Sequence, residues 1–305
     1  MKRYIVILNP TAGKGHAERR IPEIESFFKE HKLEFEIIQT ERPGHAIKLA
    51  ETHALKEDTL IIAAGGDGTI NEIINGLMHA SNKMETKPGF GVLAIGRGND
   101  FAFSADIPVG LGEDLLRIKD GKPIPMDVGE VRGGDYPEGR YFGNGLGIGF
   151  DTLVGLEAAK MNHVHGAAGY ALGAIKTLIK YPAAPELKIS FDDEIIEVSP
   201  ALVSVMNGRR LGGSFFMAPK GKMDDGLFDL CMTRQGKRGE LLSAMIAYTK
   251  GEQAEREDTI TGRTKSLNVR ALSGTMAVHA DGETICEAGK ELQIINHKHA
   301  LNILE

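Results

Sequence analysis

The sequence has 305 residues, of which 42% are hydrophobic and 26% charged, with a net charge of −6, as is typical of a globular protein of roughly two domains. No apolar run approaches the ~20 residues that a membrane-spanning helix needs, and the negative charge provides no basic field for nucleic acid. The two cysteines, Cys231 and Cys286, form no metal-binding or disulfide pattern, so we expect a cytoplasmic protein whose only membrane contact is peripheral.

The first part of the chain alternates short apolar runs with segments whose apolar residues recur three and four positions apart, which predicts a mostly parallel α/β layer. Strands are expected at residues 4–8, 35–39, 59–64 and 91–95, and helices at residues 17–30, 45–55 and 69–78. Each strand is followed by a polar or glycine-bearing turn, at residues 9–15, Thr40, 65–69 and 96–100. Because ligands bind at the carboxyl ends of the strands in such sheets, we expect these turns to share one crevice.

From about Pro125 the pattern changes to the alternation of apolar and polar residues that is typical of β-strands. Strands at residues 187–191 and 195–198 flank a turn at Asp192 and Asp193. Helices are expected near residues 151–161, 168–179 and 240–248, and residues 291–304 look strand-forming and could join either domain. The chain is therefore expected to contain an α/β domain followed by a β-rich domain.

The loop after the third predicted strand consists of Gly65, Gly66, Asp67, Gly68 and Thr69. Its glycines can adopt positive φ and let backbone amides close on an anion at the start of the next helix, which suits a phosphate group. A purely structural interpretation exists, because Thr69 and Glu72 are spaced as a capping box. That interpretation does not explain Asp67, since an acid beside a phosphate is unfavourable unless a metal ion or a reacting hydroxyl is present. We therefore favour a phosphate site.

Two further loops fit a phosphate site less specifically. The turn at residues 9–15 lacks the spacing and the final Ser or Thr of a P-loop, so a plain turn and a nucleotide contact remain equally open. In the loop at residues 96–100, Arg97 could pair with phosphate, and Asp100 could bind a metal ion or cap the next helix.

Two acidic turns in the second domain have structural explanations when each is taken alone. Residues 224–226 could form a β-turn or bind a hard cation through oxygen atoms. Residues 281–283 lie between apolar runs, like the tip of a hairpin. His163 and His165 are spaced for no common helix face and predict no metal site.

Taken together, these motifs resemble the bacterial diacylglycerol kinase catalytic-domain family, the YegS/BmrU-like lipid kinases related to sphingosine and ceramide kinases. The resemblance covers nearly the whole chain and rests on an ordered set: Asn9, Pro10, Gly13, residues 65–72, Asn75, Gly76, residues 98–101, Met126, Asp127, Asn207, Gly208, Gly212, Gly213, Pro219, residues 224–226 and residues 281–283. It implies an α/β nucleotide-binding domain of residues 1–125, joined by residues 291–305, and a β-sandwich lipid-binding domain of residues 126–290, with the active site in the cleft between them.

The resemblance also implies ATP and Mg²⁺ as cofactors and assigns residues to them. The nucleotide would contact Asn9, Gly13, Thr40, Gly65, Gly66, Asp67, Gly68, Thr69, Ile70, Asn71, Arg97 and Asp100. A structural Mg²⁺ would lie at Asp225 with the carbonyl oxygens of Lys222 and Leu227. Asp281 or Glu283 would accept the proton of the substrate hydroxyl, while Asp67 and Asp100 act through a catalytic Mg²⁺ and its waters. Arg97 departs from the Ser or Thr that is usual in the family, which leaves the nucleotide preference open.

The expected activity is transfer of the γ-phosphoryl group of ATP to a lipid hydroxyl, with diacylglycerol as the default substrate. The alternatives are an NAD kinase, which shares a Gly-Gly-Asp-Gly loop, and a catalytically silent nucleotide-binding regulator. We expect the lipid to be met at a membrane surface and no nucleic acid to bind, and a homodimer is left open. Residues 215–217, beside the basic Arg209 and Arg210, either touch the membrane or form a buried strand.

Overall fold

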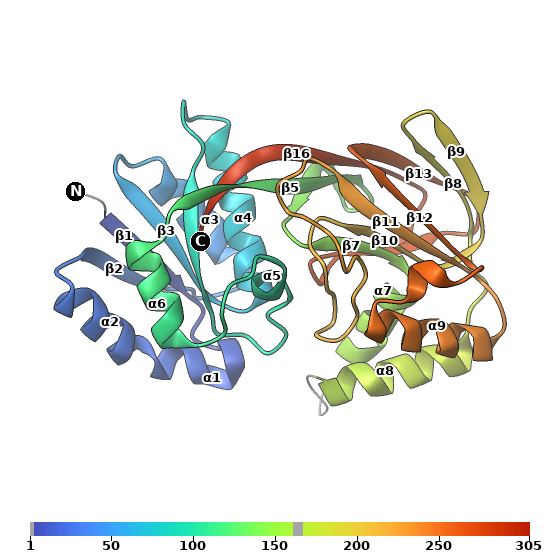
Figure 1. Ribbon diagram of the computed structural model, residues 1–305, viewed down its shortest axis with the longest axis horizontal. Helices are drawn as coiled ribbons and strands as arrows, with labels where there is room; N and C mark the ends of the chain where they lie inside the picture. The colour runs from blue at the N-terminus through green and yellow to red at the C-terminus, as the bar shows by residue number, and fades with distance from the viewer. Residues whose placement is uncertain (1–2, 161–166) are drawn as a thin grey trace. The chain divides into compact units, whose positions relative to one another are not determined.

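The computed structural model describes residues 3–160 and 167–305, and contacts along the chain divide it into two units (Figure 1). Unit 1 comprises Met1–Val128 and Lys298–Glu305, and unit 2 comprises Gly129–His297. His163 and His165, for which the sequence predicts no metal site, lie outside the described residues.

Unit 1 is built on a parallel sheet with the strand order β2-β1-β3-β4-β16. Its strands are β1 (Arg3–Leu8), β2 (Glu34–Gln39), β3 (Thr59–Gly65), β4 (Gly89–Ala94) and the end of β16 (Glu291–Leu304). The central strands β1 and β3 are buried on both faces, which is why they are nearly uninterrupted apolar runs in the sequence.

Helices cover both faces of this sheet (Figure 1). They are α1 (Ala12–Arg19), α2 (Ile21–Glu30), α3 (His45–Ala54), α4 (Asp67–Ser81), α5 (Asp100–Ser104) and α6 (Leu111–Asp120). Phe28 of α2 and Ile118 of α6 pack in one buried cluster with Val6 of β1. The single helix predicted at residues 17–30 is wrong, because the chain forms two helices and the second has a proline in its first turn, where proline is well tolerated. Helix α6 was not predicted, and α5 begins at Asp100, where the sequence left a helix start and a metal ligand as alternatives.

Helices α3 and α4 pack closely and share a cap. A Cβ on Gly76 of α4 would overlap the carbonyl oxygen of Ile47 in α3, so only glycine allows this approach. The Glu72 carboxylate accepts hydrogen bonds from the backbone N–H groups of Gly44 (2.8 Å) and Ala46 (3.0 Å), at the start of α3, where a negative charge is stabilising. The capping-box interpretation of Thr69 and Glu72 is therefore wrong: α4 already begins at Asp67, and Glu72 caps a different helix.

Unit 2 is a sandwich of two sheets with helices on one side. One sheet is antiparallel with the order β12-β11-β10-β7-β14-β15, formed by β7 (Gly145–Gly149), β10 (Pro200–Met206), β11 (Phe228–Arg234), β12 (Thr259–Thr264), β14 (Met276–Ala280) and β15 (Glu283–Gly289). The other contains β5 (Pro123–Gly133), β6 (Tyr136–Phe142), β8 (Glu186–Phe191), β9 (Glu194–Val198), β13 (Ser266–Ser273) and the first part of β16.

The core of unit 2 lies between these sheets. Val203 and Val278 of the first sheet belong to one buried cluster with Ile189, Leu267 and Leu292 of the second. Helices α7 (Phe150–Ala159), α8 (Ala167–Lys180) and α9 (Arg238–Lys250) accompany the antiparallel sheet. The predicted fold class, an α/β domain followed by a β-sandwich domain, is confirmed.

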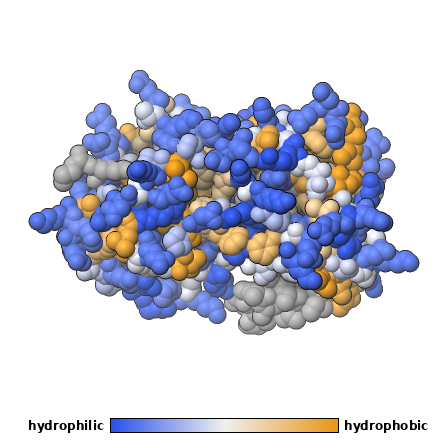
Figure 2. Space-filling view, in the orientation of Figure 1, coloured by the Kyte–Doolittle hydropathy of each residue, from blue (hydrophilic) through white to orange (hydrophobic). Residues whose placement is uncertain are grey.

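The surface drawn in Figure 2 is mostly hydrophilic, with hydrophobic side chains gathered in small patches. Of the helices in the described ranges, none has both the length and the apolar character that crossing a membrane requires.

Candidate functional site

The loops that follow β3 and β4 lie against each other at the carboxyl ends of these strands. A Cβ on Gly66 would lie 3.2 Å from the Cα of Gly96, and a Cβ on Gly96 would lie 2.6 Å from the Cα of Gly66. Gly65 is equally restricted, because the Thr69 Oγ1 atom lies 2.5 Å from the place of its missing Cβ. Glycine at these positions is what allows the two loops to meet.

This approach brings two carboxylates together. Asp67 begins α4 and Asp100 begins α5, and the Oδ2 atoms of the two side chains lie 3.1 and 3.6 Å from the position that a Cβ on Gly98 would occupy. The Oδ1 atom of Asp67 accepts a hydrogen bond from the Phe101 N–H (3.0 Å). One or two carboxylates together with phosphate oxygens form the usual donor set of protein-bound Mg²⁺, so these residues fit a nucleotide-bound magnesium ion.

The nucleotide phosphates would have to complete such a site. Within residues 3–160 and 167–305, no group of three or more His, Cys, Asp or Glu side chains is arranged to hold a metal ion.

The loop after β1 contains consecutive left-handed residues. Gly13, Lys14 and Gly15 have φ values of 59°, 61° and 77°, and for Lys14 this conformation costs on the order of 1–3 kcal/mol. Asn9 connects this loop to the one after β3, because its Nδ2 donates to Thr69 Oγ1 (3.2 Å). Backbone strain of this kind occurs where a ligand is held, which supports a nucleotide contact over a plain turn.

The remaining predicted nucleotide residues differ in exposure. Thr40 follows β2, and its N–H donates to the Leu8 carbonyl (2.8 Å) at the same end of the sheet. Gly68 and Arg97 are exposed, whereas Ile70 and Asn71 are each only 1% exposed inside α4. The side chains of Ile70 and Asn71 therefore pack inside unit 1, behind the loop, and are not directed to solvent.

Asp114 of α6, which the sequence does not single out, supports the end of β4. It is 1% exposed, its Oδ2 accepts a hydrogen bond from the Ala94 N–H (3.3 Å), and its Oδ1 is buried without a hydrogen-bond partner. Burial raises the pKa of Asp114 to about 6, although the Ala94 amide and the Arg117 guanidinium favour the charged form.

Asp114→Asn is expected to stabilise the protein at neutral pH. The folded state holds the Asp114 proton more tightly than the unfolded chain does, so the wild type loses stability as the pH rises from about 4 to about 6. At pH 7.5 we expect a gain on the order of 1–3 kcal/mol from the neutral amide, and a much smaller gain at pH 4. Urea unfolding at both pH values measures this difference. The exposed Asp120→Asn at the end of the same helix is the control, and an equal gain at both pH values would contradict the expectation.

At the hairpin tip between β14 and β15, Asp281 and Glu283, the two acids that the sequence leaves as alternative proton acceptors, have different surroundings. The Asp281 carboxylate accepts hydrogen bonds from the backbone N–H groups of Gly143 (2.7 Å), Asn144 (3.0 Å) and Gly145 (2.9 Å), and its backbone is left-handed, with φ of 48°. Glu283 is exposed at the start of β15. Asp281 thus ties the hairpin tip to the loop before β7.

The acidic turn at residues 224–226 has basic and acidic neighbours that the sequence does not reveal. Asp225 Oδ1 accepts the Leu227 N–H (3.0 Å), and Asp225 Oδ2 pairs with Arg263. The Arg263 Nε lies 3.2 Å from Asp229 Oδ1, while Asp229 Oδ2 is buried without a hydrogen-bond partner. Burial raises the pKa of Asp229, and the nearby Asp225 adds to the effect.

These residues fit a hard cation. The carboxylates of Asp225 and Asp229 both contact the single guanidinium of Arg263, so this group of three side chains has a net negative charge. The Oδ2 atom of Asp229 has no hydrogen-bond partner, and the oxygens of Asp225 retain further lone pairs. Together with the carbonyl oxygens of Lys222 and Leu227, Asp225 would hold the predicted structural Mg²⁺. The cross-strand pairing of Asp229 with Arg263 becomes visible only once β11 and β12 are aligned.

We expect MgCl₂ to raise the thermal midpoint of the wild type relative to EDTA by about 1–2 °C, the shift that corresponds to ~1 kcal/mol for a chain of 305 residues. Asp225→Ala should lose this shift, whereas Asp193→Ala, which removes an exposed acid from the turn between β8 and β9, should keep it. A wild type that melts identically in both buffers would argue against the metal site.

Unit 2 also contains an apolar pocket of about 410 Å³ between its antiparallel sheet and helices α7, α8 and α9. Its lining includes Phe150, Val154, Leu202, Leu211, Phe215, Met217 and Met245, with the polar residues Asp151, Ser214, Tyr248 and His279. Residues 215–217 belong to a loop and not to a strand, since Leu211 and Phe215 form only an isolated bridge. The alternative of a buried strand is therefore wrong, and Phe215 and Met217 line the pocket.

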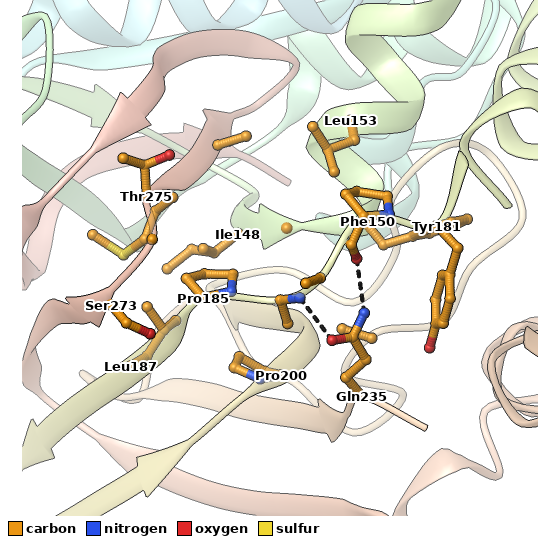
Figure 3. A pocket seen from close by; sticks show the side chains of 18 of the residues that line it. Ile148, Phe150, Leu153, Tyr181, Pro185, Leu187, Pro200, Gln235, Ser273 and Thr275 are labelled. Carbon is orange, nitrogen blue, oxygen red and sulfur yellow. Dashed lines mark hydrogen bonds between the residues drawn. The ribbon is translucent and has the colours of Figure 1, made fainter. Parts of the chain in front are cut away.

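A second cavity of about 520 Å³ lies at the other end of the hairpin (Figure 3). Thr275 and Glu287 are among its lining residues, and Gln235 accepts a hydrogen bond from the Ala184 N–H (2.6 Å) and donates one to the Pro182 carbonyl (2.8 Å). The cavity lies beside Thr275 and Met276, at the start of β14. Since a strand rises about 3.3 Å per residue, the length of β14 separates it from the hairpin tip. The apolar pocket, which His279 lines, is nearer to Glu283.

Two family models match the chain. The model described as the diacylglycerol kinase catalytic domain matches residues 3–131, and the model described as the YegS C-terminal NAD kinase beta sandwich-like domain matches residues 144–304. A diacylglycerol kinase of Bacillus subtilis (strain 168) is 31% identical over 288 residues, which cover 93% of this chain and 90% of that protein. The chain belongs to the diacylglycerol kinase family. It is accordingly a lipid kinase, a phosphotransferase with an alcohol group as acceptor that uses a nucleotide.

Further similarities agree with membership of the diacylglycerol kinase family. A diacylglycerol kinase of Staphylococcus epidermidis is 30% identical and covers 92% of this chain and 86% of its own. A putative diacylglycerol kinase from Bacillus anthracis has a similar fold, with a TM-score of 0.76, 24% identity and coverage of 99% of this chain and 96% of that chain. Yeast NADH kinase complexed with NADH shares the fold at a TM-score of 0.55 and 13% identity, with coverage of 100% of this chain and 82% of that chain.

Proposed function

We propose that this member of the diacylglycerol kinase family transfers the γ-phosphoryl group of ATP, bound together with Mg²⁺, to the free hydroxyl of diacylglycerol. The observation that carries the proposal is the meeting of the Asp67 and Asp100 carboxylates where the loops after β3 and β4 touch. The curated relatives that are named diacylglycerol kinases support the choice of acceptor.

The nucleotide is assigned to the carboxyl ends of the strands of unit 1. Backbone amides at the start of α4 and in the left-handed turn of Gly13, Lys14 and Gly15 would hold phosphate oxygens. The exposed Arg97 guanidinium can form a bidentate pair with phosphate through two N–H···O hydrogen bonds. When bound, Mg²⁺ supplies positive charge to the phosphate oxygens. Asp67 and Asp100 would hold it in place.

Within unit 2, we assign the proton acceptor to Glu283 and a positioning role to Asp281. Both carboxylate oxygens of Asp281 accept hydrogen bonds from the backbone N–H groups of residues 143–145. These bonds stabilise the charged carboxylate and make it a poor acceptor for a further proton. In the described part of the chain, no hydrogen bond or ion pair engages the Glu283 side chain. Glu283 can therefore take the proton of the alcohol as the phosphoryl group is transferred.

The apolar pocket of unit 2 is assigned to an acyl chain of the acceptor. His279 lines this pocket and precedes Asp281 by two strand positions, or about 7 Å. A lipid that fills the pocket with its chain could thus present its hydroxyl at the hairpin tip. Reaching such a lipid requires peripheral contact with a membrane surface, which sedimentation with phosphatidylglycerol vesicles would test.

The proposal is tested by incubating the protein with γ-labelled ATP and a panel of acceptors: diacylglycerol, phosphatidylglycerol, a sphingoid base and NAD. We expect label in phosphatidic acid from diacylglycerol, and none when EDTA removes Mg²⁺. Labelling of NAD alone would overturn the proposal in favour of a soluble acceptor, and ATP binding without labelling of any acceptor would indicate a silent regulator.

A further inference from the structure

The apolar pocket and the larger cavity of unit 2 are neighbours that share one side chain. The pocket of about 410 Å³ and the cavity of about 520 Å³ both have Phe150, the first residue of α7, in their lining. Among the described residues that line these two spaces, no other is common to both. Figure 3 shows Phe150 and Leu153 on the same side of the cavity. Phe150 is therefore the side chain at which the two spaces meet.

The boundary between the two spaces is thin. On β10, Ala201 lines the cavity and the next residue, Leu202, lines the pocket. On β14, Ala277 lines the cavity and His279 lines the pocket, and these residues are two strand positions, or about 7 Å, apart. A separation of this size is filled by a single layer of side chains, and Phe150 lies in that layer.

Phe150 is held in this layer by contacts with both sides of it. Its side chain is 8% exposed and belongs to a buried cluster with Val154, Ala201 and Leu241. Of these, Val154 lines the pocket and Ala201 lines the cavity. A phenyl ring forms no hydrogen bonds of its own, so packing alone holds it in place. A smaller apolar side chain at this position would leave a gap between the two spaces.

Phe150 lies at the end of β7 that is distant from the hairpin tip. Strand β7 begins at Gly145, whose N–H donates to the Asp281 carboxylate at the tip (2.9 Å), and Phe150 follows its last residue. The five residues of β7 span about 16 Å, and His279 lies beside their midpoint, opposite Gly147. An apolar chain that runs through the pocket from the tip therefore meets the Phe150 ring at the end of its path.

We propose that Phe150 is the end wall of the acyl-chain pocket and sets the longest chain that the acceptor lipid can carry. The inference rests on the proposed function, because that function assigns an acyl chain of the acceptor to this pocket. A chain that ends before Phe150 fits, whereas a longer chain meets the ring. Once the ring is removed, further methylene groups can enter the cavity behind it, whose lining includes Ile148, Leu153 and Pro200.

The test measures kcat/KM for saturated diacylglycerols from dioctanoylglycerol to dihexadecanoylglycerol, at a fixed mole fraction in detergent micelles. For the wild type we expect kcat/KM to fall by about tenfold or more at the first chain that outgrows the pocket, since an apolar pocket discriminates by this factor against one methylene group too many. In Phe150→Ala the fall should move to a longer chain, and the KM for ATP should not change.

Three further variants separate the loss of the end wall from a general loss of packing. Leu153→Ala enlarges the cavity from the same helix but leaves the wall in place, so the fall should stay at the wild-type chain length. Phe150→Ala combined with Ala277→Phe transfers the ring to another residue of the cavity lining at an unchanged total volume, and it should shorten the limit again. Phe150→Leu, which leaves a smaller gap, should shift the limit in the same direction if Phe150→Ala does not fold.

A wild-type profile without a fall would overturn the inference. A fall that stays at the same chain length when Phe150 is replaced by Ala or Leu would overturn it as well.

A binding measurement separates this inference from the proposed function. Monoacylglycerols of increasing chain length are used, below their micelle concentrations, to displace a fluorescent fatty acid. In the wild type the affinity should rise about fourfold for each added methylene group and stop rising at the limit, whereas in Phe150→Ala it should continue to rise. This result without phosphorylation of any diacylglycerol would retain the inference and lose the proposed function. Normal phosphorylation with the same limit in both proteins would overturn the inference alone.

Discussion

Asp67→Asn is expected to abolish turnover, by at least about a thousandfold, while the protein folds and melts like the wild type. The amide oxygen of asparagine can still accept the Phe101 N–H, which is the hydrogen bond of Asp67 Oδ1, so the start of α4 should be preserved. What is lost is the negative charge that faces Asp100 beside Gly98, and with it a ligand charge for a hard cation.

Transfer of label from γ-labelled ATP, together with a thermal melt of the same preparation, measures this effect. Glu57→Gln, which neutralises an exposed acid of the same unit, is the matched control and should be fully active. An Asp67→Asn protein that melts normally and still phosphorylates lipid would remove Asp67 from the chemistry.

Glu283→Gln and Asp281→Asn are expected to fail in different ways. Loss of a proton acceptor should lower kcat by about a hundredfold to ten-thousandfold, so Glu283→Gln should be nearly inactive with an unchanged melting temperature and an unchanged KM for ATP. Asp281→Asn should mainly destabilise, by about 1–3 kcal/mol, since its amide group would point a donor at N–H groups that need an acceptor.

Steady-state kinetics and urea unfolding of the two variants separate these roles. The opposite pattern, with a stable and inactive Asp281→Asn and an unstable Glu283→Gln, would assign the proton to Asp281.

The elements set by local patterns could be predicted from the sequence. The apolar runs of β1 and β3 and the hairpin of β8 and β9, with Asp192 in a left-handed turn conformation, follow from period and turn chemistry. Local patterns do not predict the contacts of Glu72. Its spacing from Thr69 is that of a capping box, but its partners belong to α3, and only the packing of α3 on α4 through Gly76 brings them within reach.

The residues of the candidate site could be predicted from the sequence, but the role of each acid could not. Motifs located Asp67, Asp100, Asp281 and Glu283, but the sequence offers no means of deciding which acid of residues 281–283 is tied to backbone amides. That depends on the loop at residues 143–145, which is distant in sequence. Asp229 with Arg263, and Asp151 with His279, are pairs of the same kind. Each joins residues from different elements, and no local pattern marks them.

The hairpin of β14 and β15 carries both His279 in the pocket and Glu283 at the tip, and Asp281 ties that tip to the loop before β7. A mutation that reshapes the hairpin to admit a different lipid is therefore expected to displace Glu283, the proposed proton acceptor, as well. Helices α7, α8 and α9 line the same pocket through Val154, Ala174 and Met245 and carry no residue assigned to the chemistry. New acceptor preferences should consequently evolve, or be engineered, through these helices.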